Sequence, residues 1–155
     1  MKAIETKYNG ILFRSRLEAR WAILFDALKL DWVYEPECFE MDNGSKYTPD
    51  FFIPKYELYI EIKPNLEWMK NPYHLERYKA FSKLFIVLSG GFPNFKVCSI
   101  FDYYGDDCAD VVFCPNSKYE PFFFTGQNVG EYDEAVNDDF YKDELDVVRS
   151  YRFWE

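Results

Sequence analysis

The sequence lacks any Cys-x-x-Cys pair and has a single histidine, His74. Its four cysteines are separated by 60, 10 and 6 positions in apolar, strand-like stretches: Cys38, Cys98, Cys108 and Cys114. Such spacing disfavours a zinc site and indicates buried free thiols in a reducing compartment. The lone histidine is best interpreted as a helix-surface residue rather than as a general base.

No apolar run approaches the roughly 18 residues that a transmembrane helix needs. The start of the sequence also lacks the basic and then apolar pattern of a signal peptide. We therefore expect a cytoplasmic protein without a membrane partner. The 155 residues suffice for one domain whose core needs neither metal nor disulfide support. Because 21% of the residues are aromatic, we expect that core to be built around Phe, Tyr and Trp.

The net charge of −9 is unevenly distributed. Residues 1–91 hold 13 basic and 13 acidic side chains, whereas residues 92–155 hold 5 basic and 14 acidic ones. Nucleic-acid-binding proteins are usually basic. The charge therefore counts against nucleic-acid binding overall, and it confines any such surface to the first part of the chain.

Residues 15–29, "SRLEARWAILFDALK", predict a helix. Their apolar positions follow the i, i+4, i+7, i+8, i+11 spacing of one buried stripe: Leu17, Trp21, Leu24, Phe25 and Leu28. Ser15 and Glu18 have the spacing of a capping box, which places the start of the helix at Ser15.

Three consecutive strands, most simply a meander, are expected next. Residues 31–41 predict a strand that Pro36 restricts to a sheet edge or a bulge. Asn43-Gly44 predicts a hairpin turn into a second strand through "YTPDFFIP". The turn "PKYE" then leads into a third strand over residues 58–63.

A helix over residues 72–82 is predicted after the third strand, with Asn71 as its N-cap and Pro72 at its first position. The apolar run over residues 84–89 predicts a strand covered on both faces. Together with the strand at 58–63, these segments have the length of a parallel crossover. Residues 95–125 predict further strands or a hairpin, and residues 133–153 an acidic amphipathic helix.

The third strand raises the functional question. Ile60 and Ile62 share one face of it, while Glu61 and Lys63 share the other, because alternate side chains of a strand point the same way. Asp50 lies eleven residues before Glu61. The plainer interpretation is a solvated Glu–Lys pair with an exposed Asp50, and the alternative is an active site.

The order helix, three strands, helix, strand, with Pro49-Asp50 on the second strand and Glu61-Ile62-Lys63 on the third, resembles the PD-(D/E)xK nuclease superfamily. The segments "FRSRLEARWAILFDAL", "WVYEPECFE" and "VRSYRF" resemble a phage-associated branch of it, which would place the protein in the host-cell cytoplasm. The resemblance implies a mixed α/β fold in a single domain. The implied domain has a restriction-endonuclease-like αβββαβ core over about residues 8–91. It also has a further β-hairpin and a helix in an acidic extension over about residues 92–155.

The resemblance also implies an Mg²⁺- or Mn²⁺-dependent nuclease that hydrolyses DNA phosphodiester bonds, including those of branched or structured DNA. Asp50 and Glu61 would hold the ion through hard oxygen ligands, and the Ile62 carbonyl would add a third oxygen. Lys63 would position the attacking water or stabilise charge at the phosphorus through its compact ammonium group.

Glu18 has two interpretations, as the first-helix glutamate that faces the metal in the family or as a capping residue alone. Arg14, Arg16 and Arg20 around it are candidates for phosphate contacts, or else form a solvated helix face. Tyr47 and Tyr59 could stack on bases, although strand packing explains them more simply.

A non-catalytic protein of the same fold is the alternative to a nuclease. It would bind DNA or a protein partner. The acidic C-terminal part is then the expected surface for that partner or for a homodimer.

Overall fold

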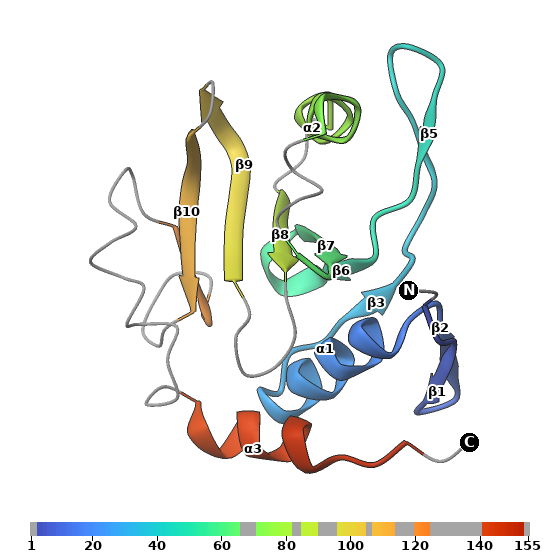
Figure 1. The fold of residues 1–155 in the computed structure, drawn as a ribbon, viewed down its shortest axis with the longest axis vertical. Helices are drawn as coiled ribbons and strands as arrows, with labels where there is room; N and C mark the ends of the chain where they lie inside the picture. Colours follow the sequence, from blue (N-terminus) through green and yellow to red (C-terminus); the bar gives the residue numbers. More distant parts are fainter. Residues whose placement is uncertain are drawn as a thin grey trace.

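The computed structural model describes residues 3–65, 71–81, 85–89, 96–104, 107–113, 120–124 and 141–153, and these form a mixed α+β fold (Figure 1). The helices are α1 (Arg16–Ala27), α2 (Pro72–Lys79), α3 (Lys142–Ser150) and the short 3-10 helix η1 (Pro54–Tyr56). The strands are β1 (Thr6–Tyr8), β2 (Ile11–Phe13), β3 (Val33–Tyr34), β4 (Phe39–Glu40), β5 (Lys46–Tyr47), β6 (Phe51–Ile53), β7 (Leu58–Lys63), β8 (Phe85–Ser89), β9 (Lys96–Tyr104), β10 (Asp107–Phe113) and β11 (Phe122–Phe124).

The main sheet has the strand order β11-β10-β9-β8-β7-β6-β3, and the pairs β1-β2 and β4-β5 form separate hairpins. β7 and β8 are parallel, with α2 between them in the chain, which confirms the predicted crossover. The remaining neighbours in the main sheet are antiparallel. The predicted C-terminal hairpin is therefore β9-β10, and it extends this sheet beyond β8 (Figure 1).

The strand predicted over residues 31–41 is two strands. Glu35 adopts a positive φ of 46°, and Pro36 follows it, so the chain leaves the sheet after β3. β3 remains the edge strand that Pro36 indicated. The chain then forms the hairpin β4-β5, in which Gly44, with a φ of 83°, donates its N–H to the carbonyl of Met41 at 2.8 Å. The predicted meander is thus β3-β6-β7, with this hairpin inserted between its first two strands.

Helix α1 begins where the sequence predicts it and ends slightly earlier. The N–H of Glu18 donates to Oγ of Ser15 at 3.1 Å, which makes Ser15 the N-cap. Lys29, with a φ of 59°, ends the helix. The buried stripe of α1 packs on one face of the sheet, to which Leu58, Ile60 and Ile62 of β7 contribute. Each such side chain stabilises the fold by roughly 1.5–3 kcal/mol.

Aromatic rings cover the opposite face of β7 and connect α2 to the hairpin β4-β5. Phe81 lies with its ring centroid 5.0 Å from Phe39, 5.4 Å from Tyr47 and 5.3 Å from Tyr59. Tyr47 and Tyr59 are both buried. Their rings therefore serve packing and are closed to bases, as the simpler interpretation expected.

Helix α3 closes the fold against α1 (Figure 1). Its buried side chains, Leu145 and Val148, belong to the same core as α1. The start of the helix predicted over residues 133–153 lies outside the described residues, and α3 accounts for its second half. No described helix has the length and apolar character needed to cross a membrane.

The prediction of buried thiols is wrong for Cys38, which is exposed. The turn at Pro36 carries the chain out of the main sheet, so Cys38 stands in the connection to β4 rather than inside a strand. The side chains of the other cysteines lie outside the described residues.

Candidate functional site

The structure brings Asp50 and Glu61 together on one face of the sheet. In the β6-β7 register Phe51 pairs with Ile60, so the next position outward sets Asp50 opposite Glu61. Asp50 Oδ2 accepts a hydrogen bond of 2.7 Å from the N–H of Ile62. The backbone of β7 thus fixes the Asp50 carboxyl beside the carboxyl of Glu61.

Glu61 is 5% exposed, so the interpretation of a solvated Glu–Lys pair is wrong. Burial, followed by the charge of Glu61 and a hydrogen bond with it, raises the pKa of Asp50 well above its usual value. The charge of Glu18 acts in the same direction, while the N–H of Ile62 opposes it. The charges of Glu61 and Glu18 therefore both act on Asp50.

Two tyrosines hold the Glu61 carboxyl. The hydroxyl of Tyr47 donates to Oε2 of Glu61 at 2.7 Å. Tyr78 of α2 also forms a hydrogen bond with Glu61, and burial and then the Glu61 charge raise its pKa. The same two causes raise the pKa of Tyr47, so both phenols keep their protons and act as donors. From the sequence we considered Tyr47 only for strand packing or for stacking on bases, and we did not predict Tyr78 as a site residue.

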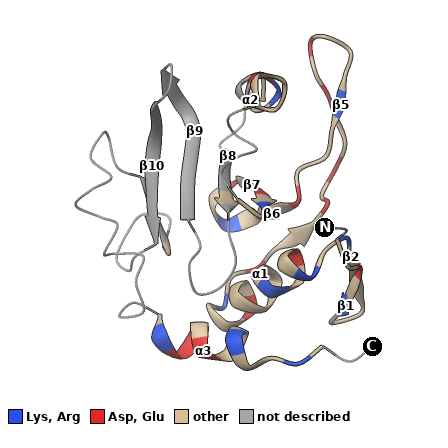
Figure 2. Ribbon diagram, viewed as in Figure 1, with Lys and Arg blue, Asp and Glu red and all other residues tan. Residues whose placement is uncertain are grey.

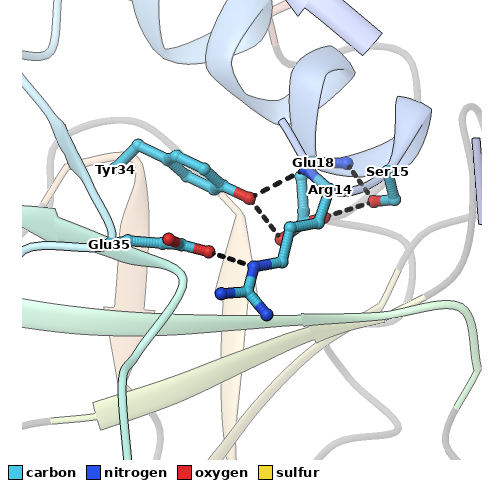
Figure 3. A network of polar contacts seen from close by, with 5 residues as sticks. All are labelled: Arg14, Ser15, Glu18, Tyr34 and Glu35. Carbon is cyan, nitrogen blue, oxygen red and sulfur yellow. Dashed lines mark hydrogen bonds and ion pairs between the residues drawn. The ribbon is translucent and has the colours of Figure 1, made fainter. Parts of the chain in front are cut away.

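Glu18 caps α1 through contacts that Figure 3 shows, and its charge acts on Asp50. Its Oε2 accepts from the Ser15 hydroxyl at 2.6 Å, and its Oε1 accepts from the Tyr34 hydroxyl at 3.1 Å. The side chain of Glu18 is therefore bonded to the hydroxyl of its cap residue, whereas a full capping box would bond it to the backbone N–H. The capping role of Glu18 is therefore observed, and its role toward a metal ion stays a prediction.

Arg14 stands beside this network and forms an ion pair with Glu35, from Nε to Oε1 at 2.5 Å (Figure 3). The backbone N–H of Arg14 donates to the Tyr34 hydroxyl at 3.0 Å. The charge of Glu35 raises the pKa of Arg14. Arg14 is thus fixed at the same end of the sheet as the carboxylates.

Arg16 and Arg20 do not join Arg14, which corrects the expectation of one arginine cluster. Both guanidinium groups lie over the ring of Phe153, at 5.8 and 5.2 Å from its centroid. Arg20 also donates to the carbonyl of Val148 at 3.0 Å. Arg16 and Arg20 project from α1 itself, whereas Arg14 lies in the loop before this helix. The side chains of Arg16 and Arg20 therefore contact the C-terminal segment instead of joining Arg14.

A polar cleft of about 230 Å³ opens next to Asp50. Its walls come from the loop before α1, the end of β3, the hairpin β4-β5 and α2. The lining residues are Arg14, Glu35, Cys38, Lys46, Thr48, Asp50 and Arg77. Three cations and two carboxylates therefore face one small space, a composition suited to an anion that is held beside acidic groups.

Lys63 is half-buried at the end of β7, in register with Ser89 of β8. After burial, the charge of Lys63 is the largest cause that lowers the pKa of His74, so these two side chains lie close together. Lys63 is not among the described residues that line the cleft. His74 lies on α2 and is half-buried rather than fully on the surface.

The described residues include no group of three His, Cys, Asp or Glu side chains arranged to hold a metal ion. The donors that do converge, Asp50 and Glu61, offer the hard oxygen atoms that Mg²⁺ and Mn²⁺ prefer. In the structure, these carboxylates accept hydrogen bonds from Ile62 and Tyr47.

Comparison of the chain with family models, curated proteins and solved structures finds no significant match.

Proposed function

We propose that this protein is a cytoplasmic Mg²⁺-dependent nuclease of the PD-(D/E)xK superfamily that hydrolyses DNA phosphodiester bonds. The observation that carries the proposal is that the half-buried Asp50 lies opposite the buried Glu61 and lines a cleft together with three cationic side chains. Two carboxyl groups in one desolvated site repel each other when both are ionised. Such perturbed pairs cluster at functional sites, where a cation or a reaction uses their charge.

The order of elements supports the specific nuclease core. α1, β3, β6, β7, α2 and β8 follow one another as helix, three antiparallel strands, helix and a parallel strand. Asp50 directly precedes the second of these strands, and Glu61 lies in the third. The hairpins β1-β2 and β4-β5 and the strands beyond β8 are additions to this order.

The donor set fits a hard divalent cation, which Asp50, Glu61 and the main-chain carbonyl of Ile62 would hold. When bound, Mg²⁺ lowers the pKa of a coordinated water and neutralises charge on the phosphoryl oxygens. Tyr47 and Tyr78 orient Glu61 through hydrogen bonds. Lys63 supplies a positive charge at the end of the same strand, and Arg14 one at the cleft.

A cleavage assay tests this proposal. Purified protein is incubated with linear duplex, single-stranded and branched DNA, with Mg²⁺, Mn²⁺ or EDTA. We expect cleavage that needs the metal and that is lost in Glu61→Gln. Glu40→Gln, which changes an exposed glutamate of β4, is the matched control and should remain active.

The hydrogen bonds within the site favour a second candidate, a non-catalytic nuclease-fold protein. Asp50 and Glu61 each accept a hydrogen bond already, and a carboxyl pair that keeps a proton needs no cation. Such a protein would bind DNA, or a protein partner or second copy through its acidic C-terminal part. Wild-type protein that stays inert on every DNA form with both metals would favour this candidate.

A further inference from the structure

We propose that α2 binds a single strand of nucleic acid, with Arg77 holding a backbone phosphate and Tyr73 stacking on a base. This inference rests on the proposed function in that it takes nucleic acid as the ligand. It goes beyond the carboxylate site by naming single strands as the preferred ligand and two residues of α2, Tyr73 and Arg77, as the residues that bind them.

Arg77 is anchored without being neutralised. Its Nη2 donates to the carbonyl of Lys46 at 3.0 Å, and its guanidinium carbon lies 4.7 Å from the centroid of the Tyr47 ring. Among the described residues, no carboxylate forms an ion pair with Arg77 or with Lys46. Both therefore keep their charge for a ligand, whereas Arg14, across the cleft, is paired with Glu35.

The Nε atom of Arg77 is buried and has no hydrogen-bond partner among the residues that the structure describes. A buried donor without a partner carries a desolvation penalty. Phosphate oxygens match the geometry of the guanidinium fork, and a bound phosphate would use the donors of Arg77 that face the cleft. Arg77 and Asp50 line the same cleft, so a phosphate on Arg77 would bring its strand beside the carboxylate pair.

The size of the cleft fits one strand. At about 230 Å³ it is smaller than the pockets of roughly 300–1,000 Å³ that enclose drug-sized ligands. It therefore accepts a phosphate with part of a sugar. Basic positions on α2 and β5 lie at the same end of the molecule, on two elements that border this cleft (Figure 2).

Tyr73 supplies the base contact. It is 68% exposed at the start of α2, four residues before Arg77. Residues at i and i+4 share one face of a helix, so the Tyr73 ring and the Arg77 guanidinium lie on the same face of α2. Aromatic rings bind single strands through stacking on bases, which a duplex hides within its own stack. This residue pair therefore favours single strands over duplexes.

Fluorescence anisotropy in EDTA tests the inference without cleavage, with an oligothymidylate of about 12 nucleotides and a hairpin duplex as probes. Tyr73→Ala should weaken binding of the single strand about five-fold or more and leave duplex binding nearly unchanged. Tyr73→Phe, which keeps the ring, should retain the affinity. Unchanged single-strand affinity in Tyr73→Ala, or an equal loss on both probes, would overturn the inference.

Arg77→Gln should weaken binding of the single strand and reduce the slope of log affinity against log salt by roughly 0.7, the share of one phosphate. The matched control is Arg152→Gln, an exposed arginine beside α3 that loses the same charge. An equal loss in this control would mean that Arg77 acts only through net charge, which contradicts the assignment. Thermal unfolding of each variant checks that α2 remains folded.

The binding and cleavage experiments separate the two proposals. Cleavage that persists while Tyr73→Ala and Arg77→Gln bind single strands like the wild type would refute the role of α2 and leave the nuclease proposal standing. Binding that depends on both residues in a protein that never cleaves would refute catalysis and support the role of α2.

Discussion

The hydroxyl of Tyr47 donates a hydrogen bond of 2.7 Å to Oε2 of Glu61, across 14 positions of sequence. The hairpin β4-β5 brings Tyr47 over β7, and both side chains are buried. Because burial and the Glu61 charge raise the pKa of Tyr47, the phenol stays protonated at neutral pH. Glu61 therefore has a fixed position before any ligand arrives.

Removing this hydroxyl should destabilise the fold. We expect Tyr47→Phe to lower the free energy of unfolding by about 1.5–3 kcal/mol, the range for a hydrogen bond to a charged group. Urea denaturation measures the loss. Tyr73→Phe is the control, because it removes the same hydroxyl from a side chain that is 68% exposed. A loss in Tyr73→Phe as large as that in Tyr47→Phe would contradict the contribution assigned to the Glu61 contact.

Asp50 should make the metal-free protein less stable as pH rises. Its pKa in the folded protein lies above the usual 3.8, so between these two values the folded chain binds more protons than the unfolded chain. Stability is therefore full below about pH 3.8 and decreases as pH rises through the folded pKa.

Asp50→Asn should remove this dependence and raise the free energy of unfolding at pH 7. The gain is roughly 1.4 kcal/mol for each unit by which the pKa of Asp50 is raised. Denaturant unfolding in EDTA between acid and neutral pH measures it, with the exposed Asp42→Asn as control. A variant less stable than the wild type at pH 7 would contradict the repulsion.

Metal binding should depend on both carboxylates. We expect Asp50→Asn and Glu61→Gln each to weaken Mn²⁺ binding in calorimetry at least about ten-fold, because each removes one charged oxygen ligand. Glu40→Gln, on the exposed side of β4, should bind like the wild type. Unchanged Mn²⁺ affinity in both site variants would argue against a metal site here.

The C-terminal helix should be part of the cooperative fold. Leu145 is 1% exposed and packs in the core shared with α1, so Leu145→Ala should lower the free energy of unfolding by about 2–5 kcal/mol. Val147→Ala, at an exposed position of the same helix, should change it little. Thermal and urea unfolding compare the two. Equal effects would mean that α3 is not docked on α1 as the structure has it.

Local signals in the sequence were sufficient for the elements that surround the motif. Ser15 set the start of α1, Asn71 and Pro72 set the start of α2, and the alternation of residues 58–63 defined β7 with its two faces. The parallel crossover to β8 also followed from segment lengths. These features depend on neighbouring residues, which a single sequence contains in full.

Long-range contacts were beyond such signals. Tyr47 reaches Glu61, and Arg77 reaches the carbonyl of Lys46, because two separate elements fold over one strand. The helical spacing of Arg16 and Arg20 could not reveal that Phe153, far along the chain, lies under their guanidinium groups. The spacing of residues along one helix or strand predicts which side chains share a face. It does not predict which other part of the chain packs against that face.

Lys63 best separates a nuclease from a binding protein. If its ammonium group stabilises charge at the reacting phosphate, Lys63→Ala should lower the single-turnover cleavage rate about 10²–10³-fold, as the loss of a comparable electrostatic donor does. Mn²⁺ affinity should stay the same or rise, because a cation has left the neighbourhood of Glu61. Stability should change by at most about 1 kcal/mol, since Lys63 is partly exposed to solvent.

Lys55→Ala, which removes an exposed lysine from η1, is the control for this change and should leave the cleavage rate unaltered. DNA affinity in EDTA should fall only slightly in Lys63→Ala, because one phosphate contact is lost among several. A loss of cleavage that follows the loss of affinity would indicate that Lys63 only binds DNA. Cleavage that is lost while DNA and Mn²⁺ binding persist would support a role of the Lys63 charge in the transition state.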